Sequence, residues 1–249
     1  FLKNYEFADI NLFAGTRFAK KAAPSGTRQY NDENTPNRWE GSSADNKWHI
    51  ISWGYARNSK FTNKSAGVII AIKKTYATVQ QIKQRYDPPN DLAGRLGAIR
   101  IKQGRGEDDP DLFVGVGYSP QEDKEEEIRS HFWDGLNFMA KQAPQRSTST
   151  WGIDGNGSVE CKDDWVFGDI RPNWEANNNG NSLYEVCRAR GLVAINTWRA
   201  TAVGTTDWKG QTFWGPPPVN STTRPDYLLV SRAQAHKCSV VVRYDLAIR

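Results

Sequence analysis

The stretch Trp165-Val166-Phe167-Gly168-Asp169-Ile170-Arg171-Pro172-Asn173 predicts a β-strand that presents a carboxylate at its end, because an apolar run leads directly into Gly-Asp. Asp169 is therefore the first candidate for a functional side chain. Short β-branched or aromatic runs bounded by turn residues recur on both sides of this stretch and predict further strands. These runs lie at residues 9–13, 48–53, 66–72, 96–101, 112–118, 192–197, 225–231 and 239–244.

Two segments between the predicted strands have helical periodicity. Residues 122–142 begin with acidic side chains, which offset a helix dipole, and continue with an apolar face. Residues 182–190 end at Gly191, a residue typical of helix C-termini. Many strands with few helices predict an α/β layered sandwich of two mixed β-sheets flanked by helices, rather than a doubly wound sheet.

The chain of 249 residues is long enough for one domain, and we expect a single domain over residues 1–249. Residues 22–47 are rich in Gly, Pro, Asn, Asp and Ser, which predicts a long surface loop or insertion. The longest apolar stretch, 68–72, is far shorter than the roughly 20 residues that cross a membrane. A start at Phe1 is compatible with removal of an organelle-targeting segment, but the sequence names no compartment.

The composition limits the classes of partner. A net charge of +5 favours nucleic acid, a lipid surface or an acidic protein, or else it is the charge of a mildly basic soluble protein. Three widely spaced cysteines, Cys161, Cys187 and Cys238, are typical of buried or free thiols and predict neither a zinc site nor a disulfide framework.

Seven short motifs follow one another along the chain. They lie at Phe13–Arg17, Ser65–Ile70, Gly117–Gln121, Gly168–Arg171, Gly180–Leu192, Arg224–Ser231 and Tyr244–Leu246. In this order they resemble the endonuclease/exonuclease/phosphatase superfamily, and they are most similar to the endonuclease domains of non-LTR retroelements. The resemblance places the family's Gly-Asp-Phe-Asn motif on Gly168–Arg171 and its Arg-Ile-Asp-Tyr strand on Arg224–Ser231.

The departures from the family pattern concern the chemistry. The resemblance implies that the metal-binding Glu is replaced by Gly15, the substrate-positioning Asn by Arg171 and the terminal His by Leu246. The family's first strand has no counterpart. The remaining positions of the site are Tyr118, Asp169, Asp226 and Asp245. Since metal and proton-transfer groups are lost together, we expect no catalytic residue, no metal and no cofactor.

Three functions stay open. The first is a catalytically inactive member of this fold that acts as a structural or docking subunit, so that other protein subunits are its partners. The absence of the first strand supports it, because an unpaired strand edge invites strand addition by a partner. The second is a Mg²⁺-dependent endonuclease or phosphodiesterase with an altered site. The third is a nucleic-acid-binding module without chemistry.

One loop is a candidate binding surface. Trp208, Lys209, Phe213 and Trp214 follow one another in the segment that contacts nucleic acid in the family that the chain resembles. Aromatic rings beside a lysine stack on bases in single-stranded nucleic-acid complexes. The same rings also serve as anchors in protein interfaces. The sequence leaves these two interpretations open.

Overall fold

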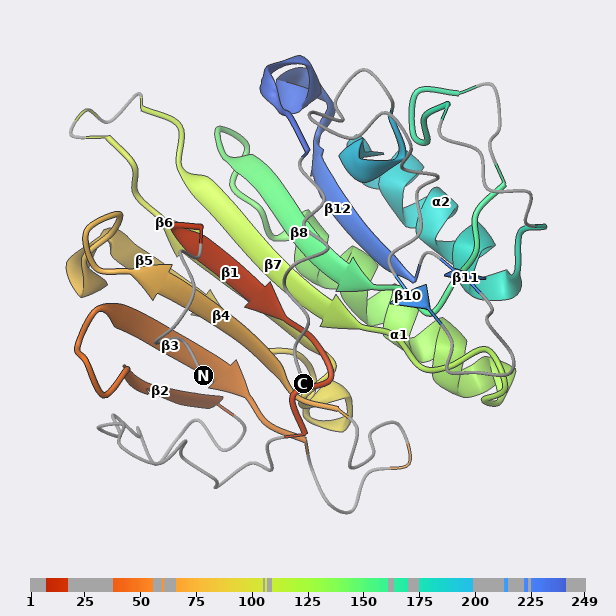
Figure 1. The fold of residues 1–249 in the computed structure, drawn as a ribbon, viewed down its shortest axis with the longest axis horizontal. Coiled ribbons are helices and arrows are strands. Elements are labelled where there is room, and N and C mark those ends of the chain that lie inside the picture. Colours follow the sequence, from red (N-terminus) through yellow and green to blue (C-terminus); the bar gives the residue numbers. More distant parts are fainter. Residues whose placement is uncertain are drawn as a thin grey trace.

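Two β-sheets face each other across an apolar core in the computed structural model, and both α-helices cover the outer face of the larger sheet (Figure 1). The structure describes part of the chain. The described residues are 8–17, 38–55, 60, 66–104, 106, 109–160, 164–169, 175–198, 213–214, 222–223 and 225–240. This arrangement is the α/β layered sandwich that the sequence predicts, with one antiparallel and one mixed sheet.

The smaller sheet has four antiparallel strands. Their spatial order is β1 (Ile10–Phe13), β4 (Val68–Lys73), β3 (Trp48–Trp53) and β2 (Arg38–Ser42). Among the described residues β1 pairs only with β4, so it forms one edge of this sheet. The predicted loop at 22–47 is wrong for Arg38–Ser42, which forms β2 and pairs with β3; residues 22–37 lie outside the described part.

The larger sheet has six strands. Their spatial order is β5 (Ile82–Tyr86), β6 (Leu96–Ile101), β7 (Leu112–Tyr118), β8 (Thr148–Asp154), β12 (Asp226–Ser231) and β9 (Leu192–Ala194). β7 and β8 run parallel, and the other described pairs in this sheet are antiparallel. A parallel pair needs a crossover connection, which α1 (Glu126–Lys141) provides.

Short elements complete the described fold. The 3₁₀ helices are Val79–Gln81, Asn90–Leu92, Ile195–Thr197 and Arg232–Lys237, and a separate pair of strands comprises β10 (Phe213–Trp214) and β11 (Thr222–Thr223). No helix in these described segments is long and apolar enough to cross a lipid bilayer.

The second helix, α2 (Asn178–Arg190), begins earlier than the sequence predicts and ends where it predicts. The side chain of Asn177 accepts a hydrogen bond from the Gly180 N–H and caps the first turn, at 2.8 Å. Gly191 adopts a left-handed conformation with φ of 62°, which terminates the helix. Asn179 is fully buried: its Oδ1 accepts from Trp133 Nε1 of α1 at 2.9 Å, and its Nδ2 donates to the Pro120 carbonyl at 2.9 Å.

The strand predicted at Trp165–Asp169 is wrong. Only Phe167 makes a β-bridge in this stretch, with Ala194 of β9. Among the strands of the two large sheets, the sequence analysis missed β2, β5 and β8. In β8, buried and partly exposed residues alternate along Thr-Ser-Thr-Trp-Gly-Ile-Asp. Since the alternating small polar residues give β8 little apolar character, its local signal is weaker than that of the Trp165 stretch. Of the predicted strand at 239–244 only Ser239 and Val240 are described, and Val240 makes a single bridge.

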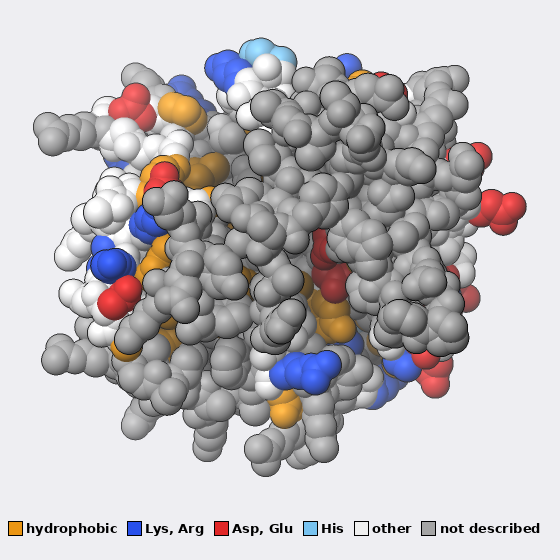
Figure 2. Space-filling model, in the orientation of Figure 1, with side chains coloured by type: hydrophobic (Ala, Val, Ile, Leu, Met, Phe, Trp, Pro, Cys, Tyr) orange, Lys and Arg blue, Asp and Glu red, His pale blue; other side chains and the backbone are white. Residues whose placement is uncertain are grey.

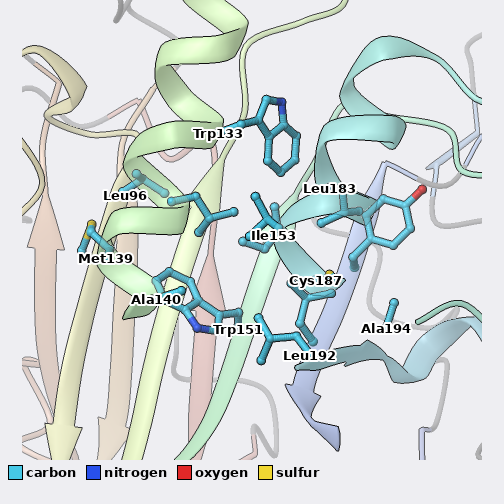
Figure 3. Packing of buried hydrophobic residues seen from close by; sticks show 14 of the residues in the cluster. Leu96, Trp133, Met139, Ala140, Trp151, Ile153, Leu183, Cys187, Leu192 and Ala194 are labelled. Atoms are coloured by element: carbon cyan, nitrogen blue, oxygen red, sulfur yellow. The ribbon is translucent and has the colours of Figure 1, made fainter. Parts of the chain in front are cut away.

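Two apolar layers hold the sandwich together. Side chains from both sheets, including Trp53, Ile70, Ile99 and Val116, form the layer between the sheets. A second layer lies between the larger sheet and the helices and includes Trp151, Met139 and Leu183 (Figure 3). Each layer contains a tryptophan ring seated on a glycine. A Cβ atom on Gly97 would lie 2.2 Å from the Trp53 ring, and one on Gly115 would lie 2.2 Å from the Trp151 ring.

We predict that Trp151→Ala lowers the free energy of unfolding by about 3–5 kcal/mol, because it empties a fully buried ring position. Phe138→Ala on α1 is the matched control, since the Phe138 side chain is 59% exposed, and its effect should stay within about 0.5 kcal/mol. Chemical denaturation followed by fluorescence and circular dichroism measures both. Equal losses in the two variants would contradict the described packing.

Candidate functional site

A cleft of about 370 Å³ lies between β1 and the inner face of the larger sheet. Ile10, Leu12 and Ala14 line it from the β1 side. The opposite side is formed by the ends of β7, β8 and β12, and its polar residues are Asp154, Asn196 and Asp226. Figure 2 shows acidic side chains at the floor of a hollow on the face that carries β1, with apolar side chains beside them. The cleft therefore combines an apolar wall with a concentration of negative charge.

Asp154 and Asp226 lie directly opposite each other on neighbouring antiparallel strands. Residues in this position present their side chains on the same face of a sheet, with Cβ atoms about 4.5–5.5 Å apart. Burial and the negative charge of Asp226 raise the pKa of Asp154 to about 7. The backbone N–H of Asn156 and the charge of Arg95 oppose this increase. Asp154 therefore exchanges its proton close to neutral pH.

Tyr118 ends β7 and lies opposite Asp154 in the parallel pairing of β7 with β8. The next residue, Ser119, is fully buried and joins the two strand ends, because its N–H donates to the Asp154 carbonyl at 2.8 Å. The Ser119 hydroxyl also donates to the Gly155 carbonyl. These bonds fix the position of Tyr118 relative to the carboxylate of Asp154.

Asn156 follows Asp154 by two residues and folds back on the same turn. Its backbone N–H donates to Oδ1 of Asp154 at 3.2 Å, and its Nδ2 donates to the Ser119 carbonyl at 2.9 Å. Its φ of 42° lies in the left-handed region, which asparagine adopts more readily than most residues. The turn therefore holds the Asp154 carboxylate at the end of β8.

Asn196 supports the second carboxylate from β12. Its Nδ2 donates to the Asp226 carbonyl at 2.9 Å, and its Oδ1 accepts from the Leu228 N–H at 3.0 Å. These two bonds satisfy the backbone of β12 beyond the end of β9, where no strand within the described residues continues the ladder. Asn196 therefore fixes the strand end that carries Asp226.

The structure brings two of the predicted site residues together and separates a third. Tyr118 and Asp226 both adjoin Asp154, as described above. Asp169 is exposed, follows the Phe167 bridge at the β9 edge, and does not belong to the described lining of the cleft. Gly15 follows the cleft residue Ala14 and adopts a φ of 65°.

Other predicted positions cannot be placed. Arg171, Asp245, Leu246, Trp208 and Lys209 lie outside the described residues. Phe213 and Trp214 form β10, which pairs with β11, and their side chains are not described.

The sequence analysis missed Asp154 and Asn156. The signal was present, because Gly152-Ile153-Asp154-Gly155-Asn156 contains an Asp followed two residues later by an Asn. This is the Asp-x-Asn pattern that we sought at Asp169 and found broken by Arg171. The intact copy lies at the end of β8, the strand that directly follows α1, and its Asp154 lines the cleft.

The donor set of the cleft fits a cation that needs few protein ligands. Among the described residues no group of three or more His, Cys, Asp or Glu side chains is arranged to hold a metal ion. Asp154 and Asp226 supply two carboxylates, and burial together with the negative charge of Asp226 raises the pKa of Asp154. Mg²⁺ binds proteins through one or two carboxylates and keeps water and substrate phosphate as its other ligands.

No family model matches the chain, and no curated relative matches it. Several solved structures match the chain, and each of those described below covers 92% of it. They include the AP endonuclease LMAP of Leishmania major, with 14% identity, a TM-score of 0.54 and 71% of its chain covered. The 3′ phosphatase NExo of Neisseria, bound to a product DNA hairpin, is 13% identical with a TM-score of 0.57, and 78% of its chain is covered. An AP endonuclease of Archaeoglobus fulgidus is 17% identical with a TM-score of 0.55, and 78% of its chain is covered. The chain shares the fold of these proteins.

The raised pKa of Asp154 predicts how stability depends on pH. Between about pH 4 and pH 7 the folded protein keeps a proton on Asp154 that the unfolded chain releases, so the wild type loses stability as pH rises through this window. Asp154→Asn removes this loss. Its free energy of unfolding relative to the wild type should rise by about 2 kcal/mol between pH 4 and pH 8.

Urea denaturation at several pH values, without divalent cations, measures this difference. Asp169→Asn is the matched control, because Asp169 is exposed. A constant difference between Asp154→Asn and the wild type across this range would show that Asp154 has an ordinary pKa.

Proposed function

We propose that this protein is a divalent-cation-dependent phosphodiesterase that acts on nucleic acid, with its reaction centre at Asp154 and Asp226. The single observation that carries this proposal is the direct pairing of these two residues at the floor of the cleft. Two carboxylates on adjacent positions of one face repel each other and weaken the sheet unless a cation or a proton separates their charges. A stable fold that keeps this pair supports a role in binding.

The neighbouring residues suit phosphoester hydrolysis. Asp154 ends β8 and presents its carboxylate to the cleft, where it would bind the cation. Tyr118 lies beside it at the end of β7 and supplies a hydroxyl that can donate to a phosphate oxygen. Asn196 and Asn156 keep the two strand ends in place.

Asp154 and Asp226 would hold the cation, and the cation would neutralise the negative charge of the phosphate. The net charge of +5 suits an anionic polymer as substrate. The names of the structural neighbours, two AP endonucleases and a 3′ phosphatase bound to a DNA hairpin, support a nucleic-acid phosphoester as the substrate class.

A second candidate is the catalytically inactive docking subunit. The observation that favours it is Gly15, which places no side chain beside the cleft where the family pattern has a carboxylate. Leu246 also supplies no proton where that pattern has a His. Under this hypothesis the cleft keeps its shape without turnover, and the protein acts through subunits that copurify with it.

We predict that the wild type nicks supercoiled plasmid or abasic-site DNA in Mg²⁺ or Mn²⁺ and that EDTA abolishes the activity. Asp154→Asn should lower the rate at least about 100-fold, because it removes the negative charge of a cation ligand. Asp226→Asn should also lower it. Asp169→Asn is the control and should stay within about threefold of the wild type, since it lies outside the cleft lining.

The same assay separates the alternatives. If Asp169→Asn lost activity while Asp154→Asn kept it, the reaction centre would lie at Asp169, the position that the sequence first suggested. A folded wild type without any cation-dependent cleavage would exclude the phosphodiesterase and favour the inactive subunit. Salt-dependent binding of a labelled oligonucleotide without cleavage would instead indicate a nucleic-acid-binding module.

A further inference from the structure

Arg95 is a buried cation directly behind the cleft. It precedes β6, and only 4% of its surface is exposed. Burial lowers the pKa of its guanidinium, while Tyr118 and the negative charge of Asp154 raise it. Arginine remains charged in proteins even when buried, so this residue brings a fixed positive charge to the interior. Such a group requires a structural or functional reason, because burying a charge is costly.

The contacts of Arg95 converge on the end of β7. Its guanidinium carbon lies 5.0 Å from the centre of the Tyr118 ring, within the range of a cation–π interaction. Its Nη1 donates to the carbonyls of Tyr118 and Ser119, both at 3.3 Å. The Arg95 carbonyl also accepts from the Tyr118 N–H at 2.8 Å. Arg95 therefore holds the ring and the backbone of Tyr118 at the same time.

The same group also reaches the turn after β8. The Ser119 carbonyl accepts from Arg95 and from Nδ2 of Asn156, so one oxygen joins the two strand ends. A guanidinium can stack on a ring with its plane while its N–H groups donate sideways. A lysine ammonium has neither the plane nor the fixed fork, so it cannot make both contacts in one geometry.

We propose that Arg95 is a positioning residue of the site: it clamps the Tyr118 ring and the Tyr118–Ser119 backbone in one orientation beside Asp154. The effect on turnover rests on the proposed phosphodiesterase activity, whereas the clamp itself does not. Arg95 acts through Tyr118 and has no role in contact with the substrate. The clamp replaces side-chain freedom beside Asp154 by a fixed ring, which is how a site is preorganised.

The test replaces Arg95 by lysine and follows Tyr118 directly. 3-Fluorotyrosine is incorporated at position 118, and its ¹⁹F resonance is recorded without substrate or metal. We expect one narrow resonance in the wild type, because a clamped ring keeps its fluorine on one side. Arg95→Lys should give a shifted resonance that is broadened or split in two. The matched control is Arg100→Lys on β6, the strand that directly follows Arg95. The Arg100 side chain pairs with Asp111, and the spectrum of this variant should match the wild type.

Kinetics then test the consequence. In Arg95→Lys, kcat should fall about 10- to 100-fold while KM changes less than about threefold, whereas Arg100→Lys should keep both values. An unchanged ¹⁹F spectrum in folded Arg95→Lys would overturn the clamp, and so would two resonances in the wild type. If Arg95→Lys does not fold, Arg95→Gln undergoes the same measurements. A wild type that shows the clamped resonance but no cleavage refutes the proposed activity and leaves the clamp standing.

Discussion

The parallel pairing of β7 with β8 is the constraint on which the rest of the site depends. Its register places Tyr118 opposite Asp154, and the antiparallel β12 then adds Asp226 on the other side of Asp154. This order requires α1 as the crossover, and α1 in turn buries the helix-side layer around Trp151. A slip of one residue between β7 and β8 would turn the Asp154 side chain to the opposite face, away from the cleft.

Large parts of the fold could be predicted from local pattern alone. The runs at 48–53, 96–101 and 112–118 coincide with β3, β6 and β7, and Gly191 ends α2 as predicted. These residues are buried on both faces of a strand or end a helix in a left-handed conformation, so their local sequence carries the signal. β2 was hidden at the end of a polar segment, because an edge strand of the sequence Arg-Trp-Glu-Gly-Ser needs only half of its residues buried.

The site was harder to predict than the fold because pairing between distant segments decides it. The Gly168-Asp169 pair has a stronger local pattern than Ile153-Asp154, yet only the second lies on a central strand. Asp226 and Tyr118 were predicted from the resemblance, whose motifs cover the start of β12 and the end of β7. Arg95 and Asn196 could not be found from the sequence, because their partners lie 23 to 32 residues away. Nothing in their immediate neighbours marks them.

Because the cleft depends on the buried amide of Asn179, it assembles late during synthesis of the chain. Asn179 ties the turn before α1 to α2, and Asp226 is 72 residues beyond Asp154, so neither support exists when β7 and β8 leave the ribosome. At ordinary elongation speeds the interval between the two aspartates is roughly 4 to 14 seconds. The cleft therefore holds only half of its acidic pair until Asp226 has been synthesised and β12 has paired with β8.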